Sequence, residues 1–244
     1  LEAWTPGMKA ELESQYSKDC LIPISVEEVK KWQNEEKMKV KILPSKLVAT
    51  KKKKPKAPVK LKARLVACGN KDEEDTSKDT YAGGADVTAV RCALRTAALK
   101  DWEVRTKDVS TAFLNAPYTI EGEILVLIPP RVFVKAGLIK ENEVWKVHKA
   151  IYGLKEASLL WAKERDNKLK DLEIKVPKSS RKEGGREDHE KDDVDADARF
   201  SLQKFQTDVN TWHILDKKGE VEGILLTYVD DIMVAASEKS QKQQ

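Results

Sequence analysis

Cysteine and histidine are scarce in this sequence. Its 244 residues include three cysteines and three histidines. The cysteines are odd in number, widely spaced and without a Cys-x-x-Cys pair, and the histidines do not stand at the spacing of metal ligands. We therefore expect no disulfide framework, no structural zinc and no histidine-rich metal site. Such a sequence fits a reducing compartment, which is the cytoplasm or the nucleus.

Long hydrophobic runs are absent as well. No apolar stretch approaches the roughly 20 residues that span a bilayer, and the N-terminus lacks the basic and apolar regions of a signal peptide. We therefore expect no membrane partner. The first residue is Leu1 rather than Met, which favours a fragment of a longer protein. Hydrophobic residues form 40% of the chain and charged residues 35%, which predicts a globular core with an unusually charged surface or charged insertions.

Positive charge is concentrated in one block of the chain. Residues 30–64 hold 14 lysines and arginines against two acids, whereas the remainder holds 31 basic and 39 acidic residues. Such a block suggests a polyphosphate or nucleic-acid partner. A solvated, lysine-rich loop is the alternative. Residues 177–199 hold eight acids and six basic residues with almost no apolar ones, which predicts a disordered or exposed insertion.

The spacing of apolar residues predicts a mixture of helices and strands. Residues 40–50 and 59–68 predict a basic β-hairpin around an exposed turn at 51–60. Helices are expected at residues 24–39 (capped by Ser25), 86–100 and 157–172. Further strands are expected at residues 103–109, 124–128, 144–147, 199–205, 211–215 and 221–229. This pattern predicts an α+β fold, an antiparallel sheet with helices packed on one face.

Two adjacent acids, Asp230 and Asp231, interrupt two apolar runs that favour strands. A pair of carboxylates inside a buried strand would carry a large desolvation cost, so we predict a hairpin with the acids at its tip. Acids held at a rigid tip can bind a divalent metal ion, which offsets their mutual repulsion. The alternative is a solvated turn between two strands.

A third acid, Asp108, lies at the end of the strand predicted at residues 103–109. An acid at a strand end can face the tip of a neighbouring hairpin, so three carboxylates could meet at one sheet edge. Two-metal phosphoryl chemistry needs this arrangement, because ions roughly 4 Å apart clamp the attacking and leaving oxygens. Mg²⁺ suits such a site because it takes oxygen ligands and keeps positions for substrate phosphates.

Four short motifs occur in the order, and near the spacing, of one known family. They are residues 62–69 (Lys-Ala-Arg-Leu-Val-Ala-Cys-Gly), 108–115 (Asp-Val-Ser-Thr-Ala-Phe-Leu-Asn), 151–155 (Ile-Tyr-Gly-Leu-Lys) and 228–231 (Tyr-Val-Asp-Asp). With them the chain resembles the reverse transcriptase (RNA-dependent DNA polymerase) of copia-type LTR retrotransposons, over about residues 32–236. Each motif alone is moderately specific, and the ordered set is highly so.

The resemblance implies the fingers and palm of a right-hand polymerase, with the thumb missing. Residues 25–100 would form the fingers with the basic hairpin, and residues 101–236 the palm with the insertion at 177–199. Polar segments, 1–24 and 237–244, would flank them. The implied activity is nucleotidyl transfer to a primer 3′-hydroxyl. The implied partners are an RNA or DNA template with its primer and deoxynucleoside triphosphates, while the oligomeric state stays open.

By the same resemblance, Asp108, Asp230 and Asp231 are the catalytic acids, and the Val109 carbonyl adds a metal ligand. They would hold two Mg²⁺ or Mn²⁺ ions, with Asp108 and Asp230 bridging both. Tyr228 would pack beneath the primer terminus. Lysines of the hairpin turn would contact template phosphates, namely Lys51, Lys52, Lys53 and Lys54.

Six further residues fall where the family binds the incoming nucleotide. They are Lys62, Arg64, Phe113, Tyr152, Gly153 and Lys155. Lys62 and Arg64 share one face of the predicted strand, as two contacts to one triphosphate require. Gly153 permits close approach of the backbone. Phe113 falls at the steric gate that excludes ribonucleotides, although an ordinary core phenylalanine is the alternative.

The chain also departs from the family. After Lys155 the family usually has Gln, a small residue, Pro and Arg, whereas this chain continues with Glu156, Ala157, Ser158 and Leu159. Glu156 would place an acid near phosphates. These departures and the missing thumb leave a second hypothesis open, a degenerate relic that is inactive and at most binds nucleic acid. A third hypothesis, an unrelated two-metal nuclease or cyclase on a palm-like fold, fits the ordered motifs less well.

Overall fold

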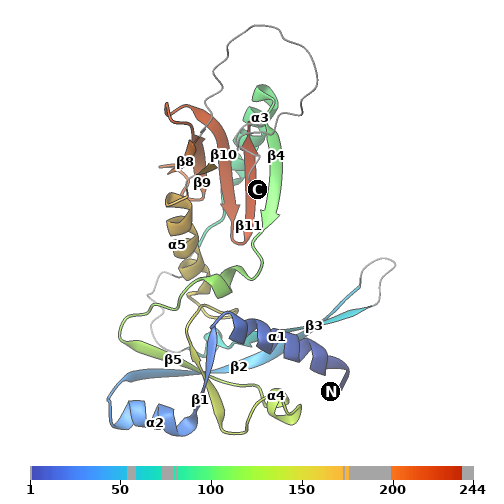
Figure 1. The fold of residues 1–244 in the computed structure, drawn as a ribbon, viewed down its shortest axis with the longest axis vertical. Helices are drawn as coiled ribbons and strands as arrows, with labels where there is room; N and C mark the ends of the chain where they lie inside the picture. The colour runs from blue at the N-terminus through green and yellow to red at the C-terminus, as the bar shows by residue number, and fades with distance from the viewer. Residues whose placement is uncertain are drawn as a thin grey trace, which may run out of the picture. The chain divides into compact units, whose positions relative to one another are not determined.

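Figure 1 shows the computed structural model of the chain, which describes residues 2–53, 59–72, 80, 82–172, 174–175 and 199–237. Contacts divide the chain into two units. Unit 1 comprises Leu1–Ala82 and Thr111–Glu164, and unit 2 comprises Gly83–Ser110 and Arg165–Gln244. The units therefore interleave along the chain, whereas contiguous segments were expected. The assignment of fingers and palm to these units stays a prediction.

Unit 1 contains a five-stranded sheet with the order β1-β6-β5-β2-β3. Its strands are β1 (Leu21–Ser25), β2 (Lys39–Lys52), β3 (Lys60–Ala67), β5 (Glu123–Ile128) and β6 (Glu143–Val147). The pairing of β2 with β5 is parallel, and the other pairs are antiparallel. The predicted basic hairpin is confirmed, because β2 and β3 pair in register out to Lys52 and Lys60. The turn residues 54–58 lie outside the described residues.

Helices and 3-10 turns complete unit 1. Ser25 caps α2 (Val26–Asn34) as predicted, since its Oγ accepts a hydrogen bond from the Glu28 N–H at 3.2 Å. The sequence did not predict α1 (Thr5–Ser17), which buries Met8 and Leu12. Glu11 of α1 accepts a hydrogen bond from the Leu65 N–H on edge strand β3 at 3.0 Å. The remaining short elements are η1 (Glu2–Trp4), η2 (Gly69–Lys71), η3 (Ala112–Asn115) and α4 (Arg131–Lys135).

Unit 2 contains a six-stranded antiparallel sheet with the order β4-β11-β10-β9-β8-β7. Its strands are β4 (Glu103–Asp108), β7 (Ile174–Lys175), β8 (Arg199–Lys204), β9 (Thr211–Leu215), β10 (Val221–Tyr228) and β11 (Asp231–Ala236). The helices are α3 (Val87–Lys100), capped by Asp86, and the last residues of α5 (Ala157–Lys170). The α+β fold class and the strands predicted for this region are thereby confirmed.

The prediction that the helices pack on one face of the sheet is wrong for unit 2. Leu225 of β10 packs in one core with Leu169 of α5. Its neighbour Leu226 packs in another core with Ala93 of α3. Consecutive strand residues point to opposite faces, and both are apolar here, so each face needs its own cover. Figure 1 accordingly shows β10 between α5 and α3.

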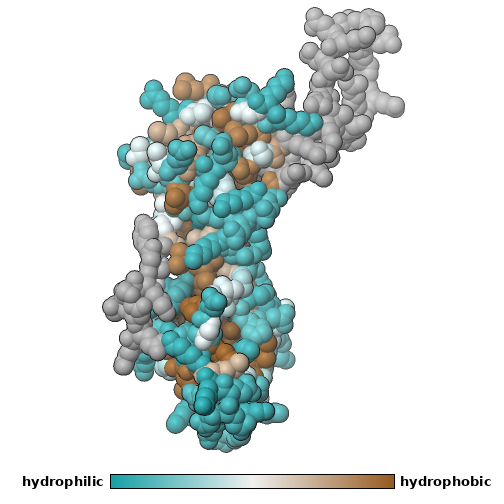
Figure 2. All heavy atoms as spheres, turned by 90° about the vertical axis from the view of Figure 1, so that its left-hand side faces the viewer, coloured by the Kyte–Doolittle hydropathy of each residue, from teal (hydrophilic) through white to brown (hydrophobic). Residues whose placement is uncertain are grey.

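The surface reflects the high content of charged residues. Figure 2 shows one face of the molecule on which hydrophilic side chains predominate and hydrophobic ones are scattered among them. None of the described helices is long and apolar enough to cross a membrane. Residues 177–198 of the insertion predicted at 177–199 lie outside the described residues, as does the tail after Ser237, whereas Arg199 begins β8.

Candidate functional site

The adjacent acids lie at the tip of a β-hairpin, as predicted. Strands β10 and β11 pair so that Tyr228 faces Asp231, which leaves Val229 and Asp230 as a two-residue turn. Val229 has a φ of 53°. A β-branched residue rarely adopts this left-handed conformation, so the turn stores strain. Strained turns of this kind cluster at functional sites.

Asp108 lies beside this tip. It is the last residue of β4 and pairs directly with Asp231, the first residue of β11. The next residue, Val109, donates its N–H to the Asp230 carbonyl at 2.8 Å. The backbones of all three acids therefore gather at one end of the unit 2 sheet. The predicted meeting of a strand end with a hairpin tip is confirmed, while the metal role of these residues stays a prediction.

The acidic side chains at this end of the sheet lower the stability of the fold. Asp108 and Asp231 stand directly opposite each other on one face, where like charges destabilise a sheet. Both are exposed, and Asp230 is half-buried. Among the described residues no cation pairs with the three carboxylates, and no three acid, histidine or cysteine side chains converge to hold one metal ion.

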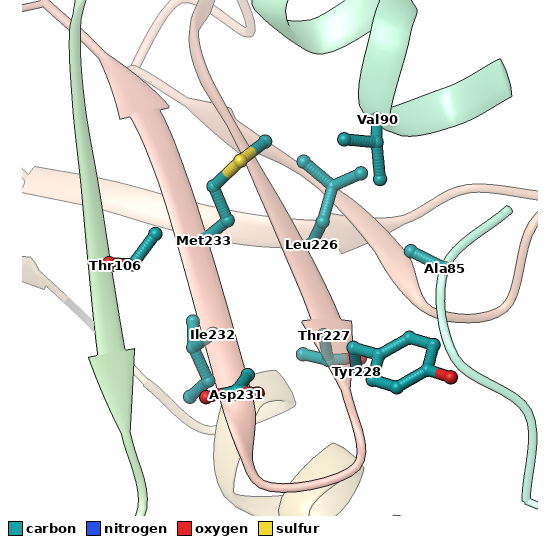
Figure 3. A pocket seen from close by; sticks show the side chains of 9 residues that line it. All are labelled: Ala85, Val90, Thr106, Leu226, Thr227, Tyr228, Asp231, Ile232 and Met233. Atoms are coloured by element: carbon teal, nitrogen blue, oxygen red, sulfur yellow. The ribbon is translucent and has the colours of Figure 1, made fainter. Parts of the chain in front are cut away.

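A pocket of about 360 Å³ within unit 2 adjoins one of the acids, Asp231 (Figure 3). Asp231 and Tyr228 lie at one end of it, and Leu226, Met233 and Val90 form its apolar part. Tyr228 is 63% exposed. A large aromatic residue exposed beside a carboxylate offers a stacking surface and an acceptor to a ligand.

Three residues predicted to bind the nucleotide contact one another in unit 1. The Arg64 guanidinium lies over the Tyr152 ring, 4.2 Å from its centroid. The Phe113 ring meets the same Tyr152 ring edge-on, with centroids 5.1 Å apart. All three side chains are half-buried. Phe113 is thus neither a fully buried core residue nor an isolated one, and Arg64 is held by a cation–π contact.

Gly153 joins two of the sequence motifs. It has a φ of 88°, which favours glycine, and its carbonyl accepts a hydrogen bond from the Gly69 N–H at 3.1 Å. The neighbouring Tyr152 carbonyl accepts from the Ala67 N–H at 2.8 Å. A Cβ on either glycine would overlap the opposing backbone. The Gly153 backbone therefore packs closely against residues 67–69 of the chain itself, and its approach to a bound nucleotide stays a prediction.

Lys155 and Glu156 face a buried charged cluster in unit 1. Lys155 donates its ammonium to the Asp72 carbonyl at 2.7 Å. The Asp72 carboxylate pairs with Lys41, which lies 3.8 Å from Glu123. All three side chains of that cluster are at most 7% exposed. Glu156 is buried as well, so its charge faces the interior and not a nucleotide phosphate.

The cluster shifts the pKa values of its members. Burial raises the pKa of Tyr118, and the negative charges of Glu156 and Glu123 raise it further. Burial alone would lower the pKa of Lys41, but the hydrogen bond to Asp72 and the charge of Glu123 outweigh it and raise the pKa. The phenol therefore stays neutral and the ammonium stays charged at physiological pH.

The remaining predicted residues lie on the basic hairpin of unit 1. Lys62 is half-buried on β3 and shares its strand face with Arg64. Lys51 and Lys53 are exposed, Lys52 ends β2, and Lys54 lies outside the described residues. Sequence reasoning missed the buried residues behind the acidic hairpin, Arg165, Asn210 and Thr227. A single Asn between two strands looks like any turn residue, so no signal could have identified it.

A model of the family "Reverse transcriptase (RNA-dependent DNA polymerase)" matches residues 30–184. The chain is also 36% identical over 113 residues to the "Retrovirus-related Pol polyprotein from transposon TNT 1-94" of Nicotiana tabacum, covering 46% of this chain. It is 34% identical over 109 residues, 44% of this chain, to the corresponding transposon RE1 polyprotein of Arabidopsis thaliana. A putative transposon Ty5-1 protein of Saccharomyces cerevisiae is 40% identical over 68 residues, 27% of this chain.

The matched part of the chain spans only a small share of these relatives. It covers 8% of the tobacco polyprotein, 7% of the Arabidopsis polyprotein and 20% of the yeast protein. No solved structure matches the chain. The family match includes Asp108 but ends before Tyr228, so the acidic hairpin is linked to the family by motif order and by its pairing with β4.

Proposed function

The chain belongs to the reverse transcriptase (RNA-dependent DNA polymerase) family, and from this premise we propose that it catalyses RNA-directed DNA synthesis by two-metal nucleotidyl transfer. Its units would supply the fingers and palm of a right-hand polymerase of the copia type. The substrates would be a primed RNA or DNA template and deoxynucleoside triphosphates.

The observation that carries the proposal is the direct pairing of Asp108 with Asp231. Two carboxylates opposite each other weaken a sheet, and the strained Val229 turn beside them weakens it further. Local rules of stability are broken in this way mainly at functional sites. A cation bound between the acids would turn this repulsion into attraction.

The three acids carry the type of ligand atom that hard divalent cations take. Carboxylate oxygens are the ligands that Mg²⁺ and Mn²⁺ take, and the Val109 carbonyl is a further oxygen at the same sheet end. Asp108 and Asp230 would hold the ions, and Asp231 would support them. The bound ions would lower the pKa of the primer 3′-hydroxyl and neutralise the triphosphate. The protein's part is to hold these carboxylates on the rigid ends of β4, β10 and β11.

Residues of unit 1 would bind the nucleotide. The Arg64 guanidinium, oriented by the Tyr152 ring, forks onto phosphate oxygens, and Lys62 adds a point charge on the same strand face. Phe113, braced by Tyr152, excludes a 2′-hydroxyl. Lys51–Lys54 contact template phosphates, and Tyr228 supports the primer terminus.

Primer extension on an RNA template tests this proposal. Asp230→Asn should abolish incorporation in Mg²⁺ or Mn²⁺, because the neutral amide is a poor ligand for either ion. Salt-sensitive binding of primer-template should stay at the wild-type level, because the basic hairpin is unchanged. Asp101→Asn is the matched control, since Asp101 is an exposed aspartate of unit 2 with a left-handed φ of 53° that Asn tolerates.

Activity in the wild type and in Asp101→Asn, with none in Asp230→Asn, would support the assigned role. Equal activity in Asp230→Asn and wild type would refute it. A wild type that binds primer-template but incorporates no nucleotide would identify the chain as the inactive relic of the second hypothesis.

A further inference from the structure

Thr227 lies on β10 just before the hairpin turn, and each of its polar atoms makes a hydrogen bond. It is fully buried. Its N–H donates to the Asn210 carbonyl at 2.9 Å, and its hydroxyl donates to the same oxygen at 3.2 Å. Its own carbonyl accepts from the Ala85 N–H at 2.9 Å. The end of β10 is therefore fixed by two segments that are distant in sequence.

Asn210 is in turn hydrogen-bonded to a buried arginine, Arg165. It is 5% exposed, and its Oδ1 accepts from Arg165 Nη2 at 3.1 Å. The Arg165 side chain is 4% exposed and donates through Nε and Nη2 to Asp166 Oδ1 at 3.0 and 2.8 Å. The Asn210 N–H donates to Asp208 Oδ1 at 3.0 Å. Several hydrogen bonds hold the planar guanidinium in one orientation, so it fixes the position of the Asn210 side chain.

The second segment also holds Tyr228. A Cβ on Gly84 would overlap the Tyr228 ring, so the ring lies directly against the Gly84 backbone. In Figure 3 the ring extends from the end of β10 to the segment that carries Ala85. Gly84 and Ala85 therefore contact Tyr228 and Thr227, the last two residues of β10 before the hairpin turn.

This support matters because the turn is strained. Val229 has a φ of 53°, and such a conformation persists only where the surrounding structure over-determines it. Thr227, the residue before Tyr228, is where hydrogen bonds from other segments reach this end of β10. Without these hydrogen bonds the turn could relax, and Asp230 could move away from Val109. The Val109 N–H donates to the Asp230 carbonyl at 2.8 Å.

We propose that Thr227, Asn210 and Arg165 are positioning residues that hold the acidic hairpin in its strained conformation against β4. The inference rests on the proposed function for its effect on catalysis. Its structural part concerns the hairpin alone. These residues act through the backbone of β10 and touch neither substrate nor metal.

Two conservative variants test the proposal. Thr227→Val removes the hydroxyl and keeps the shape, whereas Thr227→Ser keeps the hydroxyl. Hydrogen exchange of the Val109 amide reports the contact between the hairpin and β4. We expect Thr227→Val to speed this exchange about tenfold, the order expected for one buried hydrogen bond. The amides of β8 and β9 should keep their rates, and Thr227→Ser should restore the Val109 rate.

Primer extension gives the second readout. Thr227→Val should lower kcat about tenfold and leave the KM for nucleotide unchanged, with recovery in Thr227→Ser. An unchanged Val109 exchange rate in Thr227→Val, or an equal acceleration of all unit 2 amides, would overturn the proposal. If the wild type incorporates no nucleotide, the proposed function fails, and the exchange of Val109 still decides the positioning role by itself.

Discussion

The charged cluster of unit 1 and the acidic hairpin tip of unit 2 place their charges in opposite ways. Unit 1 buries Lys41, Asp72 and Glu123 as a paired cluster inside its fold. Unit 2 has apolar cores on both faces of its sheet and exposes Asp108 and Asp231 at one end. Charges that are buried and paired specify a fold, because removing one partner leaves the others uncompensated. Charges that are exposed and mutually repelling weaken a fold, and a cation bound between them would offset their repulsion.

The sharpest way to test this contrast is to remove the buried cation. Lys41→Met keeps the length of the side chain but removes the ammonium that pairs with Asp72 and lies 3.8 Å from Glu123. We expect unit 1 to lose about 3 to 5 kcal/mol of unfolding free energy, which is typical for a broken buried pair. Urea denaturation checks this when it is followed separately at Trp145 of unit 1 and Trp212 of unit 2, both fully buried.

Asp108→Asn is the matching change in unit 2. It removes a repulsion between exposed acids, so the transition at Trp212 should move slightly towards higher urea. A small loss of unfolding free energy in Lys41→Met, together with a large loss in Asp108→Asn, would contradict this contrast between the two groups of charges.

A smaller effect is expected from Arg64→Lys in unit 1. Lysine keeps the charge but cannot fork onto phosphate or stack on the Tyr152 ring as the guanidinium does at 4.2 Å. The KM for deoxynucleotide should rise about tenfold while kcat stays near that of the wild type. Steady-state primer extension separates the two constants. A fall in kcat with unchanged KM would move Arg64 from nucleotide binding to catalysis.

The smallest effect concerns alkaline pH. Tyr118 and Lys41 of unit 1 have raised pKa values, and burial and Glu143 raise the pKa of Tyr16 there too. A raised folded-state pKa gives stability that is complete below the unfolded value, near 10 for tyrosine, and is lost as the pH rises through the folded value. Among the described residues of unit 2 the shifted pKa values are lowered, that of Asp86 by its hydrogen bonds with Thr88 and that of His213 by burial.

Unit 1 should therefore open before unit 2 as the pH rises above 10. Fluorescence of variants that retain only Trp145 or only Trp212 follows each unit during an alkaline titration. Simultaneous transitions at both tryptophans would show that the buried cluster does not distinguish the units.

The parts of the fold that follow from local pattern were predictable. Alternation gave the β2–β3 hairpin, the capping box of Ser25 and Glu28 gave the start of α2, and the cost of burying two acids gave the turn at Val229 and Asp230. In each case the signal and the structure lie within a few residues of each other.

The parts that depend on distant contacts were not predictable. Helix α1 is polar along most of its length, and only its packing on β3 reveals Met8 and Leu12 as core residues. The opposite placement of α3 and α5 depends on which helix meets Leu225 and which meets Leu226. Glu156 looks like a surface acid until Lys41 and Tyr118 are placed beside it. Residues that act only through long-range partners carry no sequence signal.

Binding of Mn²⁺, measured by electron paramagnetic resonance with primer-template and a non-incorporable nucleotide present, tests the central claim most directly. The claim is that the carboxylates of Asp108, Asp230 and Asp231 hold the catalytic cations. Wild type and Asp101→Asn should bind Mn²⁺ alike, and Asp108→Asn or Asp230→Asn should weaken binding at least about tenfold, a loss typical of a removed charged ligand. Equal binding by all four proteins would contradict it.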